Sequence, residues 1–181
     1  DPQLSCIFIE ENKYKDIIHP THFDYLKKDI IAGKRKFFGA LTLGAIGCAM
    51  SHLKIYEDMI NNNVPYAIIF EDDIQVSIPK DEFWKKVKDI DIPKDADMFL
   101  LSATYYDWIK EISPGSNTIN LGRFTGTWAY IITNSGAKIL HKKLLPLKYQ
   151  VDFQMSILMK AGLIKIYGYT GDLIEHGDKK F

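Results

Sequence analysis

The chain has 181 residues, 46% of them hydrophobic and 25% charged, which is the composition of one soluble globular domain with a buried core. Its 23 Lys and Arg residues balance its 23 Asp and Glu residues, so no net charge attracts nucleic acid or an anionic membrane. The apolar runs are far shorter than the roughly 20 residues of a membrane span, and two cysteines, Cys6 and Cys48, indicate neither a disulfide framework nor a cysteine-rich zinc site.

Strands and helices alternate along the first half of the chain. The sequence predicts a short strand over residues 5–9 and a helix over 47–60, where apolar residues recur at three- and four-residue steps. The apolar run at 66–70 has the composition of a strand buried on both faces of a parallel sheet. A helix over 81–88, capped by its first residue, and a buried strand over 98–102 are predicted to follow.

The same alternation continues in the second half. A third buried strand over 128–133 leads into a helix over 135–145, which Asn134 can cap. A helix over 152–161 and a last strand over 164–169 complete the pattern. The alternation predicts an α/β fold with a mostly parallel central sheet flanked by helices, and ligands are then expected beyond the carboxyl ends of the strands.

Three acidic residues, Glu71, Asp72 and Asp73, directly follow the strand predicted at 66–70. At the carboxyl end of a strand they would enter the crevice in which α/β proteins bind ligands. Glu71 and Asp73 are expected to point to the same side, and two carboxylates held there suit a hard cation such as Mn²⁺ or Mg²⁺. The alternative is a solvated exit from the strand in which one acid caps the next element.

The glycines near the first long helix match neither common nucleotide-binding motif. Gly39 and Gly44 have the spacing of a phosphate-binding loop, but Ala45 and Ile46 stand where that loop needs Lys and then Ser or Thr. Gly44 and Gly47 lack the first glycine and the preceding strand of the dinucleotide fingerprint, which disfavours a Rossmann dehydrogenase. The glycines indicate instead a close approach of the helix start to another backbone or to an anion.

Three further positions each have a chemical and a structural interpretation. His52 lies beside the apolar stripe of the predicted helix and is either a ligand or, more commonly for such a position, a hydrogen-bonded core histidine. Gly126 directly precedes a strand and is either a turn or a point of backbone approach to a ligand. Asp152 stands at the start of an apolar helix, either as an N-cap or as a general base.

These features occur in an order that resembles glycosyltransferase family 25, which includes bacterial lipopolysaccharide and lipooligosaccharide galactosyltransferases and collagen hydroxylysine galactosyltransferases. The resemblance covers about residues 39 to 160 and rests on four motifs: Gly44-Ala-Ile-Gly-Cys-Ala-Met-Ser-His52, Tyr66-Ala-Ile-Ile-Phe-Glu-Asp-Asp73, Gly126-Thr-Trp-Ala-Tyr-Ile-Ile132 and Val151-Asp152. Four ordered motifs are far more specific than any one of them. The resemblance implies a GT-A type, Rossmann-like fold, a nucleotide-sugar donor, a divalent metal and inversion at the anomeric carbon.

By that similarity, Glu71, Asp72 and Asp73 stand in the place of the family's metal-binding acidic motif, and Asp152 in the place of its proposed base. His176 is a further candidate metal ligand, because many GT-A enzymes resemble one another in returning a C-terminal histidine to the metal; the alternative is an exposed tail histidine. The candidates for contacts with the nucleotide sugar come from the first and third motifs and are Gly47, Ser51, His52, Gly126 and Thr127.

The resemblance implies a metal-dependent inverting glycosyltransferase that uses Mn²⁺ or Mg²⁺. It would transfer galactose or glucose from a UDP-sugar to a glycan of lipopolysaccharide type or to hydroxylysine. The metal would neutralise the diphosphate leaving group, and Asp152 would take the proton of the acceptor hydroxyl. The alternatives are a catalytically silent sugar- or protein-binding domain on the same scaffold and, less well matched, a receiver-type phosphoacceptor domain.

We expect one glycosyltransferase domain over residues 1–181. Members of the family usually begin with a strand reading roughly Val-Ile-Asn-Leu followed by arginines, and no such segment precedes Ser5, so either the sequence lacks an N-terminal piece or the protein has lost this strand. We also expect a soluble, cytoplasmic protein with no nucleic-acid partner, although the cysteines leave its redox compartment open.

Residues 10–43 and 103–124 have no clear periodicity and are predicted to form loops that shape the substrate site. In the second of them, Tyr105, Tyr106 and Trp108 are predicted to line the acceptor side, because aromatic faces stack on sugar rings. The alternative is that they cover the core.

Overall fold

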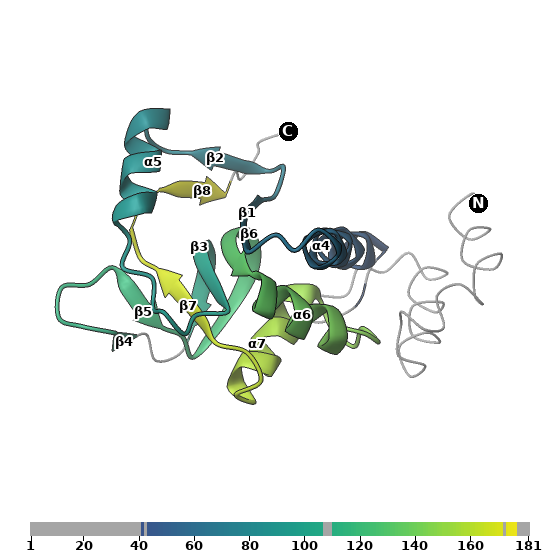
Figure 1. The fold of residues 1–181 in the computed structure, drawn as a ribbon. Helices are drawn as coiled ribbons and strands as arrows, with labels where there is room; N and C mark the ends of the chain where they lie inside the picture. Colours follow the sequence, from purple (N-terminus) through teal and green to yellow (C-terminus); the bar gives the residue numbers. More distant parts are fainter. Residues whose placement is uncertain (1–40, 42, 107–109, 172, 177–181) are drawn as a thin grey trace, which may run out of the picture.

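The computed structural model describes residues 41, 43–106, 110–171 and 173–176. None of the helices in this part of the chain is long and apolar enough to cross a membrane. Labelled as in Figure 1, the elements in chain order are α4 (Leu43–Asn61), β1 (Tyr66–Phe70), β2 (Ile74–Val76), α5 (Lys80–Asp89), β3 (Met98–Tyr106), β4 (Lys110–Glu111), β5 (Thr118–Asn120), β6 (Arg123–Thr133), α6 (Asn134–Lys143), α7 (Val151–Lys160), β7 (Ile166–Tyr169) and β8 (Ile174–His176).

The larger sheet has the strand order β1-β6-β3-β7-β5-β4, and β2 and β8 form a separate pair. Within the described residues, β3 and β7 pair in parallel. The other neighbours in this sheet, β1 with β6, β6 with β3, β7 with β5 and β5 with β4, are antiparallel. The protein is therefore α/β as predicted, but the prediction of a mostly parallel sheet is wrong.

The connection between β3 and β6 explains this difference. Residues 103–124, predicted as a loop, contain the end of β3, the short antiparallel strands β4 and β5, and the start of β6. In the described part of this connection no helix crosses the sheet, so the chain reverses direction and β6 pairs antiparallel with β3. Strand–helix alternation predicts parallel pairing only where a crossover helix separates the two strands.

Strand β1 lies at one end of the described sheet and pairs with β6, from Tyr66 opposite Thr133 to Phe70 opposite Ala129. Tyr66 is 66% exposed and Phe70 is 40% exposed, whereas Ile69 is buried. The prediction that this strand is buried on both faces is therefore wrong. The pairing has a consequence for the acidic residues, because the chain leaves β1 directly beside the middle of β6.

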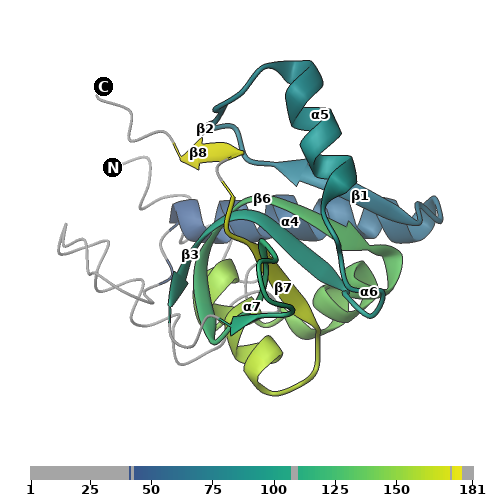
Figure 2. The ribbon, with the colours of Figure 1, turned by 90° about the vertical axis from the view of Figure 1, so that its left-hand side faces the viewer.

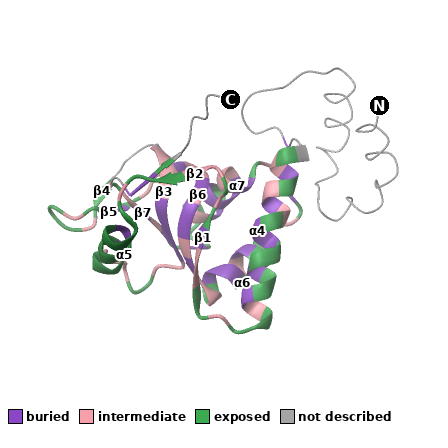
Figure 3. Cartoon of the chain, turned by 90° about the horizontal axis from the view of Figure 1, so that it is seen from above, coloured by how far each residue is buried: buried purple, intermediate pink, exposed green. Residues whose placement is uncertain are grey.

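Helices cover both faces of the sheet. Figures 1 and 2 show α5 and the β2–β8 pair together, away from α6 and α7. Alternate residues of β3 enter two clusters: Met98 and Leu100 pack with α4, α6 and α7, whereas Phe99 and Leu101 pack with α5. Burial of Met98 to Leu101 confirms the predicted buried strand at 98–102 except at Ser102, which is partly exposed. In Figure 3 the central strands are buried, and the outer face of α4 is exposed.

Two helices begin differently from the prediction. The N-cap of α6 is Thr133, whose hydroxyl accepts the N–H of Gly136 at 3.1 Å. The amide of Asn134 donates instead to two backbone carbonyls near the end of α4, at 2.9 Å each. Helix α5 begins at Lys80 after Pro79, so Asp81 lies inside its first turn. Both predicted caps are therefore wrong: the N-cap of α6 lies one residue earlier, at Thr133, and that of α5 lies two residues earlier, at Pro79, which makes no side-chain cap bond.

Gly136→Ala is expected to lower the free energy of unfolding by about 1–3 kcal/mol, because overpacking against a fixed backbone costs about that much. A Cβ at this position would overlap the backbone carbonyl of Asp97. That carbonyl accepts both the N–H and the hydroxyl of Thr133, at 3.0 and 3.1 Å, so it cannot move without loss. Urea denaturation measures the change.

Gly47→Ala is the matched control, since Gly47 also lies in a helix and a Cβ there would meet nothing within 4 Å. Alanine has the higher helix propensity, so this variant should be unchanged or up to about 1 kcal/mol more stable. Equal losses in the two variants would contradict the role given to the Asp97 carbonyl.

Candidate active site

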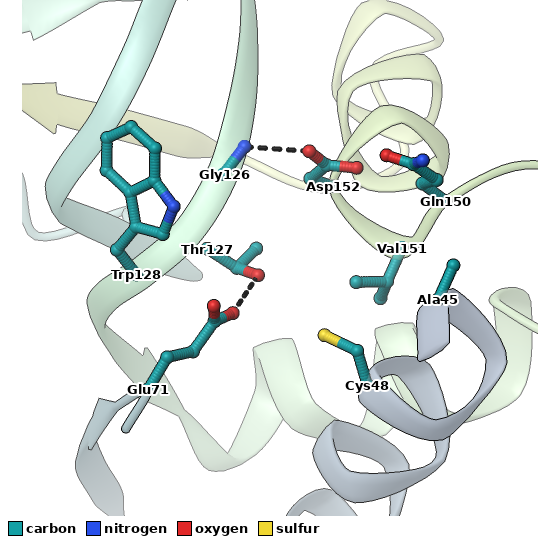
Figure 4. Close-up of a pocket in the computed structure, with 9 residues that line it drawn as sticks. All are labelled: Ala45, Cys48, Glu71, Gly126, Thr127, Trp128, Gln150, Val151 and Asp152. Atoms are coloured by element: carbon teal, nitrogen blue, oxygen red, sulfur yellow. Dashed lines mark hydrogen bonds between the residues drawn. The ribbon is translucent and has the colours of Figure 1, made fainter. Parts of the chain in front are cut away.

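The four sequence motifs converge on a pocket of about 180 Å³ (Figure 4). It lies between the start of α4, the end of β1, the middle of β6 and the start of α7. Each motif contributes lining residues, and Gln150 directly precedes the fourth motif; the lining consists of Ala45, Cys48, Glu71, Gly126, Thr127, Trp128, Gln150, Val151 and Asp152. Segments far apart in the sequence are thus brought to one cavity.

Asp152 is held at one wall by two backbone N–H groups. It is the second residue of α7, whose N-cap is Gln150 and has no side-chain cap bond. The Phe153 N–H donates to Oδ1 at 2.7 Å, within the first turn of the helix. The Gly126 N–H donates to Oδ2 at 2.7 Å and comes from β6. Asp152 is therefore more than a helix-start residue, because its carboxylate connects α7 to the sheet.

Gly126 has the backbone conformation that this contact needs. Its φ is 82°, in the region that favours glycine. A Cβ would also lie 2.7 Å from Cε2 of the Trp128 ring. The structure thus gives Gly126 a role beyond the two considered from the sequence, since it directs an N–H at Asp152.

Glu71 lies on the opposite side of the pocket from Asp152 (Figure 4). Its N–H donates to the Trp128 carbonyl at 2.9 Å, directly after β1. Its Oε1 accepts the hydroxyl of Thr127 at 2.5 Å and lies 3.1 Å from Nε2 of His52. The consecutive residues 126–128 of β6 therefore contact both carboxylates of the pocket.

His52 is buried behind Glu71, with 3% of its surface exposed. Its Nδ1 lies 2.6 Å from the Tyr130 hydroxyl, which in turn lies 2.7 Å from the Tyr56 hydroxyl. The structure agrees with the interpretation of a hydrogen-bonded core histidine, although its partners are side chains rather than backbone groups. The two tyrosines were missed from the sequence; a buried tyrosine hydroxyl that needs a partner was the available signal.

Cys48, His52 and Glu71 are the group of described residues whose ligand atoms lie close enough to hold a metal ion, all within 4.8 Å of one another. Such residue types can bind a transition metal. In the structure, however, Glu71 already occupies the Nε2 atom of His52 through the contact at 3.1 Å. Burial, and after it the charges of Glu71, Asp152 and Asp73, together raise the pKa of the Cys48 thiol from 9.0 to about 11. Cys48 is therefore a protonated, weakly nucleophilic lining residue at neutral pH.

The other candidate metal ligands lie beside this pocket rather than in its lining. Asp72 and Asp73 form the turn between β1 and β2. His176 ends β8, and its backbone pairs with Ile74 at the start of β2. The β2–β8 pair thus brings the backbone of the C-terminal candidate next to the acidic turn.

Two candidates of the first motif, Gly47 and Ser51, lie on the exposed side of α4 and do not line the pocket. The Ser51 hydroxyl donates to the Gly47 carbonyl at 3.0 Å, within the helix. Ala45, Cys48 and His52 share the other face, with the three- and four-residue spacing of a helix. That spacing is the signal by which Ala45 and Cys48 could have been selected.

Tyr105 packs against the core cluster of α4, α6 and α7 rather than lining the pocket. Its hydroxyl donates to the Leu100 carbonyl at 3.3 Å and accepts the Tyr169 N–H at 3.2 Å. For Tyr105 the structure favours the alternative of a core-covering residue. The side chain of Tyr106 and the whole of Trp108 lie outside the described residues.

Residues 9–155 match the family described as Glycosyltransferase family 25 (LPS biosynthesis protein), a range that includes all four motifs. The chain is also similar to a protein of Haemophilus influenzae named "Putative glycosyltransferase", with 32% identity over 160 residues. The aligned region covers 80% of this chain and 55% of that relative, so the chain spans about half the length of the curated relative.

The Cys48 thiol reports the electrostatics of the pocket. In a Cys6→Ser background, its alkylation rate is expected to rise with pH around an apparent pKa of about 11. Because the pKa in the folded protein exceeds the usual 9.0, the protonated thiol stabilises the fold below about pH 9, and this contribution is lost as the pH rises toward 11. An apparent pKa near 9 would contradict the burial and charge described above.

Glu71→Gln should lower the apparent pKa of Cys48 without returning it to the usual value, because burial is the larger cause and Glu71 is the first of the charges that add to it. Glu57→Gln, on the exposed side of the same helix, is the matched control and should leave the alkylation profile unchanged.

Proposed function

The chain belongs to glycosyltransferase family 25, and we propose that it is a transferase that moves galactose or glucose from a UDP-sugar to an acceptor hydroxyl, with inversion at the anomeric carbon. The proposed acceptor is a glycan, in keeping with the lipopolysaccharide biosynthesis named in the family description, or hydroxylysine. The observation that supports this most strongly is the pocket on which all four motifs converge, with carboxylates at two of its walls.

In this proposal Asp152 is the general base. An inverting transfer needs a group on the acceptor side of the sugar that takes the proton of the attacking hydroxyl. The Asp152 carboxylate lines the pocket, and its orientation is set by the Gly126 and Phe153 N–H groups. Each carboxylate oxygen has two lone pairs, so each can accept an N–H and still bind the acceptor hydroxyl.

The residues at the end of β1 fit a divalent cation. Asp72 and Asp73 offer carboxylate oxygens, the ligands that Mn²⁺ and Mg²⁺ prefer, and the β2–β8 pair brings the backbone of His176 beside them. The charges of Glu71, Asp152 and Asp73 all act on Cys48, which indicates a negative potential suited to a cation. We propose Glu71, Asp72, Asp73 and His176 as its ligands; when bound, the cation would neutralise charge on the diphosphate leaving group.

The pocket would take the sugar end of the donor. At about 180 Å³ it is smaller than the roughly 300–1,000 Å³ of most ligand sites, so a nucleotide sugar would extend beyond these nine residues. The Gly126 N–H and the Thr127 hydroxyl are already bonded to Asp152 and Glu71. Both residues would therefore act on the donor by holding the two carboxylates in place.

The deciding experiment is an assay of UDP release by the whole chain. UDP-galactose and UDP-glucose are supplied separately, each with Mn²⁺, with and without glycan or hydroxylysine acceptors. Release of UDP that depends on donor, cation and acceptor supports the proposal. Binding of a nucleotide sugar without turnover under any of these conditions would favour a silent binding domain instead.

Asp152→Asn is expected to lower turnover by roughly 10² to 10⁴, because the amide cannot take the proton of the acceptor hydroxyl. Binding of the UDP-sugar, measured by calorimetry, should be retained, since the amide oxygen can still accept one of the two N–H groups. Asp58→Asn, an exposed position on α4, is the control and should leave turnover unchanged. Turnover above about a third of wild type would contradict the assignment of the base.

Asp73→Ala is expected to abolish binding of UDP with Mn²⁺ and to change stability little. A carboxylate in a turn contributes little to folding but supplies an oxygen ligand. Calorimetric titration with Mn²⁺ and UDP measures the loss, and thermal unfolding measures stability. Unchanged Mn²⁺-dependent UDP binding would show that the cation is held elsewhere.

A further inference from the structure

A chain of buried hydrogen bonds leads from the middle of α4 to Glu71 at the pocket. The hydroxyls of Tyr56 and Tyr130 are 2.7 Å apart, Tyr130 lies 2.6 Å from Nδ1 of His52, and Nε2 of His52 lies 3.1 Å from Oε1 of Glu71. The two tyrosines are fully buried and His52 nearly so. None of these three residues lines the pocket, and yet the chain ends on a carboxylate that does.

The chemistry of the groups decides which one donates and which one accepts in each of these hydrogen bonds. An ionised Glu71 can only accept, so Nε2 of His52 carries the proton in their contact. Nδ1 of a neutral imidazole then accepts, which makes the Tyr130 hydroxyl its donor, and the Tyr130 oxygen in turn accepts from Tyr56. Burial raises the pKa of both tyrosines, so both keep the protons that they donate.

We propose that His52 is a positioning residue, held by Tyr130 as its Nε2–H tautomer, that fixes the Glu71 carboxylate at the wall of the pocket. The inference rests on the proposed function in one respect: Glu71 is taken to face the donor and its cation. Its structural part, the tautomer and the direction of the hydrogen bonds, follows from these contacts together with an ionised Glu71 and a neutral imidazole, and it does not depend on the donor.

Glu71 needs such support because of where it lies. It directly follows β1, which pairs on one side with β6 in the described sheet, and it precedes the turn at Asp72 and Asp73. Its charge shares the surroundings of Cys48 with the charges of Asp152 and Asp73, which would repel it. Two donors on one oxygen, the Thr127 hydroxyl and the His52 Nε2–H, offset that repulsion and fix the direction of the carboxylate.

The tautomer is tested without any substrate. In protein labelled with ¹⁵N at histidine, the ring signals of His52 are identified as those that are missing from the NMR spectrum of the His52→Gln variant. We expect a single Nε2–H tautomer in the wild type and a mixture of tautomers in Tyr130→Phe, which removes the donor to Nδ1. An Nδ1–H tautomer, or protons on both nitrogens, in the wild type at neutral pH would overturn the proposal.

The positioning role is tested by steady-state kinetics of UDP release. His52→Leu removes the bond to Glu71 and should raise the KM for the UDP-sugar about tenfold, with kcat within about twofold, since a bond to a charged group is lost in ground and transition states alike. His52→Gln, whose amide can still donate to Glu71, should recover part of the loss.

Asn134→Ala is the matched control for stability. It removes the hydrogen bonds from α6 to the carbonyls of Met59 in α4 and of Val64 shortly after α4, which do not line the pocket, and should destabilise the protein without changing the KM. If His52→Leu were destabilised and kept the wild-type KM, the network would be structural only and the positioning role would be wrong.

The two proposals fail in different ways. A wild-type protein that releases no UDP from any donor would contradict the proposed function. The histidine spectra would still decide the direction of the hydrogen bonds from Tyr56 to Glu71. Activity together with an Nδ1–H tautomer would retain the function and remove the role of His52.

Discussion

Three consecutive residues of β6 hold both carboxylates of the candidate active site, and the geometry of the pocket depends on them. The Gly126 N–H binds Asp152, the Thr127 hydroxyl binds Glu71, and the Trp128 carbonyl accepts the Glu71 N–H. The positive φ of Gly126 is what allows neighbouring residues of one strand to serve partners on opposite sides of the pocket. A shift of this segment would therefore displace α7 and the end of β1 together.

The antiparallel arrangement of the sheet makes this possible. Because β6 returns between β1 and β3, its middle lies beside the carboxyl end of β1, where Phe70 is paired with Ala129. The helices then complete the pocket from one face, with α4 supplying Cys48 and α7 supplying Asp152. The site thus lies where a β-strand end and two helix starts meet a continuous central strand.

Electrostatics connects the structure to the chemistry of a sugar transferase. Burial and the charges of Glu71, Asp152 and Asp73 raise the pKa of the Cys48 thiol, and the carboxylates also repel one another, so the fold is destabilised at this site. Hydrogen bonds from Gly126, Thr127 and the buried Tyr56–Tyr130–His52 chain offset part of that cost. In the proposed enzyme, a divalent cation would offset the remaining negative charge of the carboxylates and that of the donor diphosphate.

The sequence by itself determined the elements whose signals are local. Apolar runs located β3 and β6, periodicity located α4, and the ordered motifs identified the family and marked Glu71 and Asp152. Only the tertiary structure decided that the sheet is mainly antiparallel, that Gly47 and Ser51 face away from the pocket, and that Tyr56 and Tyr130, 74 residues apart, share a hydrogen bond. The physical reason is that backbone propensity and periodicity act between near neighbours, whereas strand direction and the partners of buried polar groups are set by which distant segments pack together.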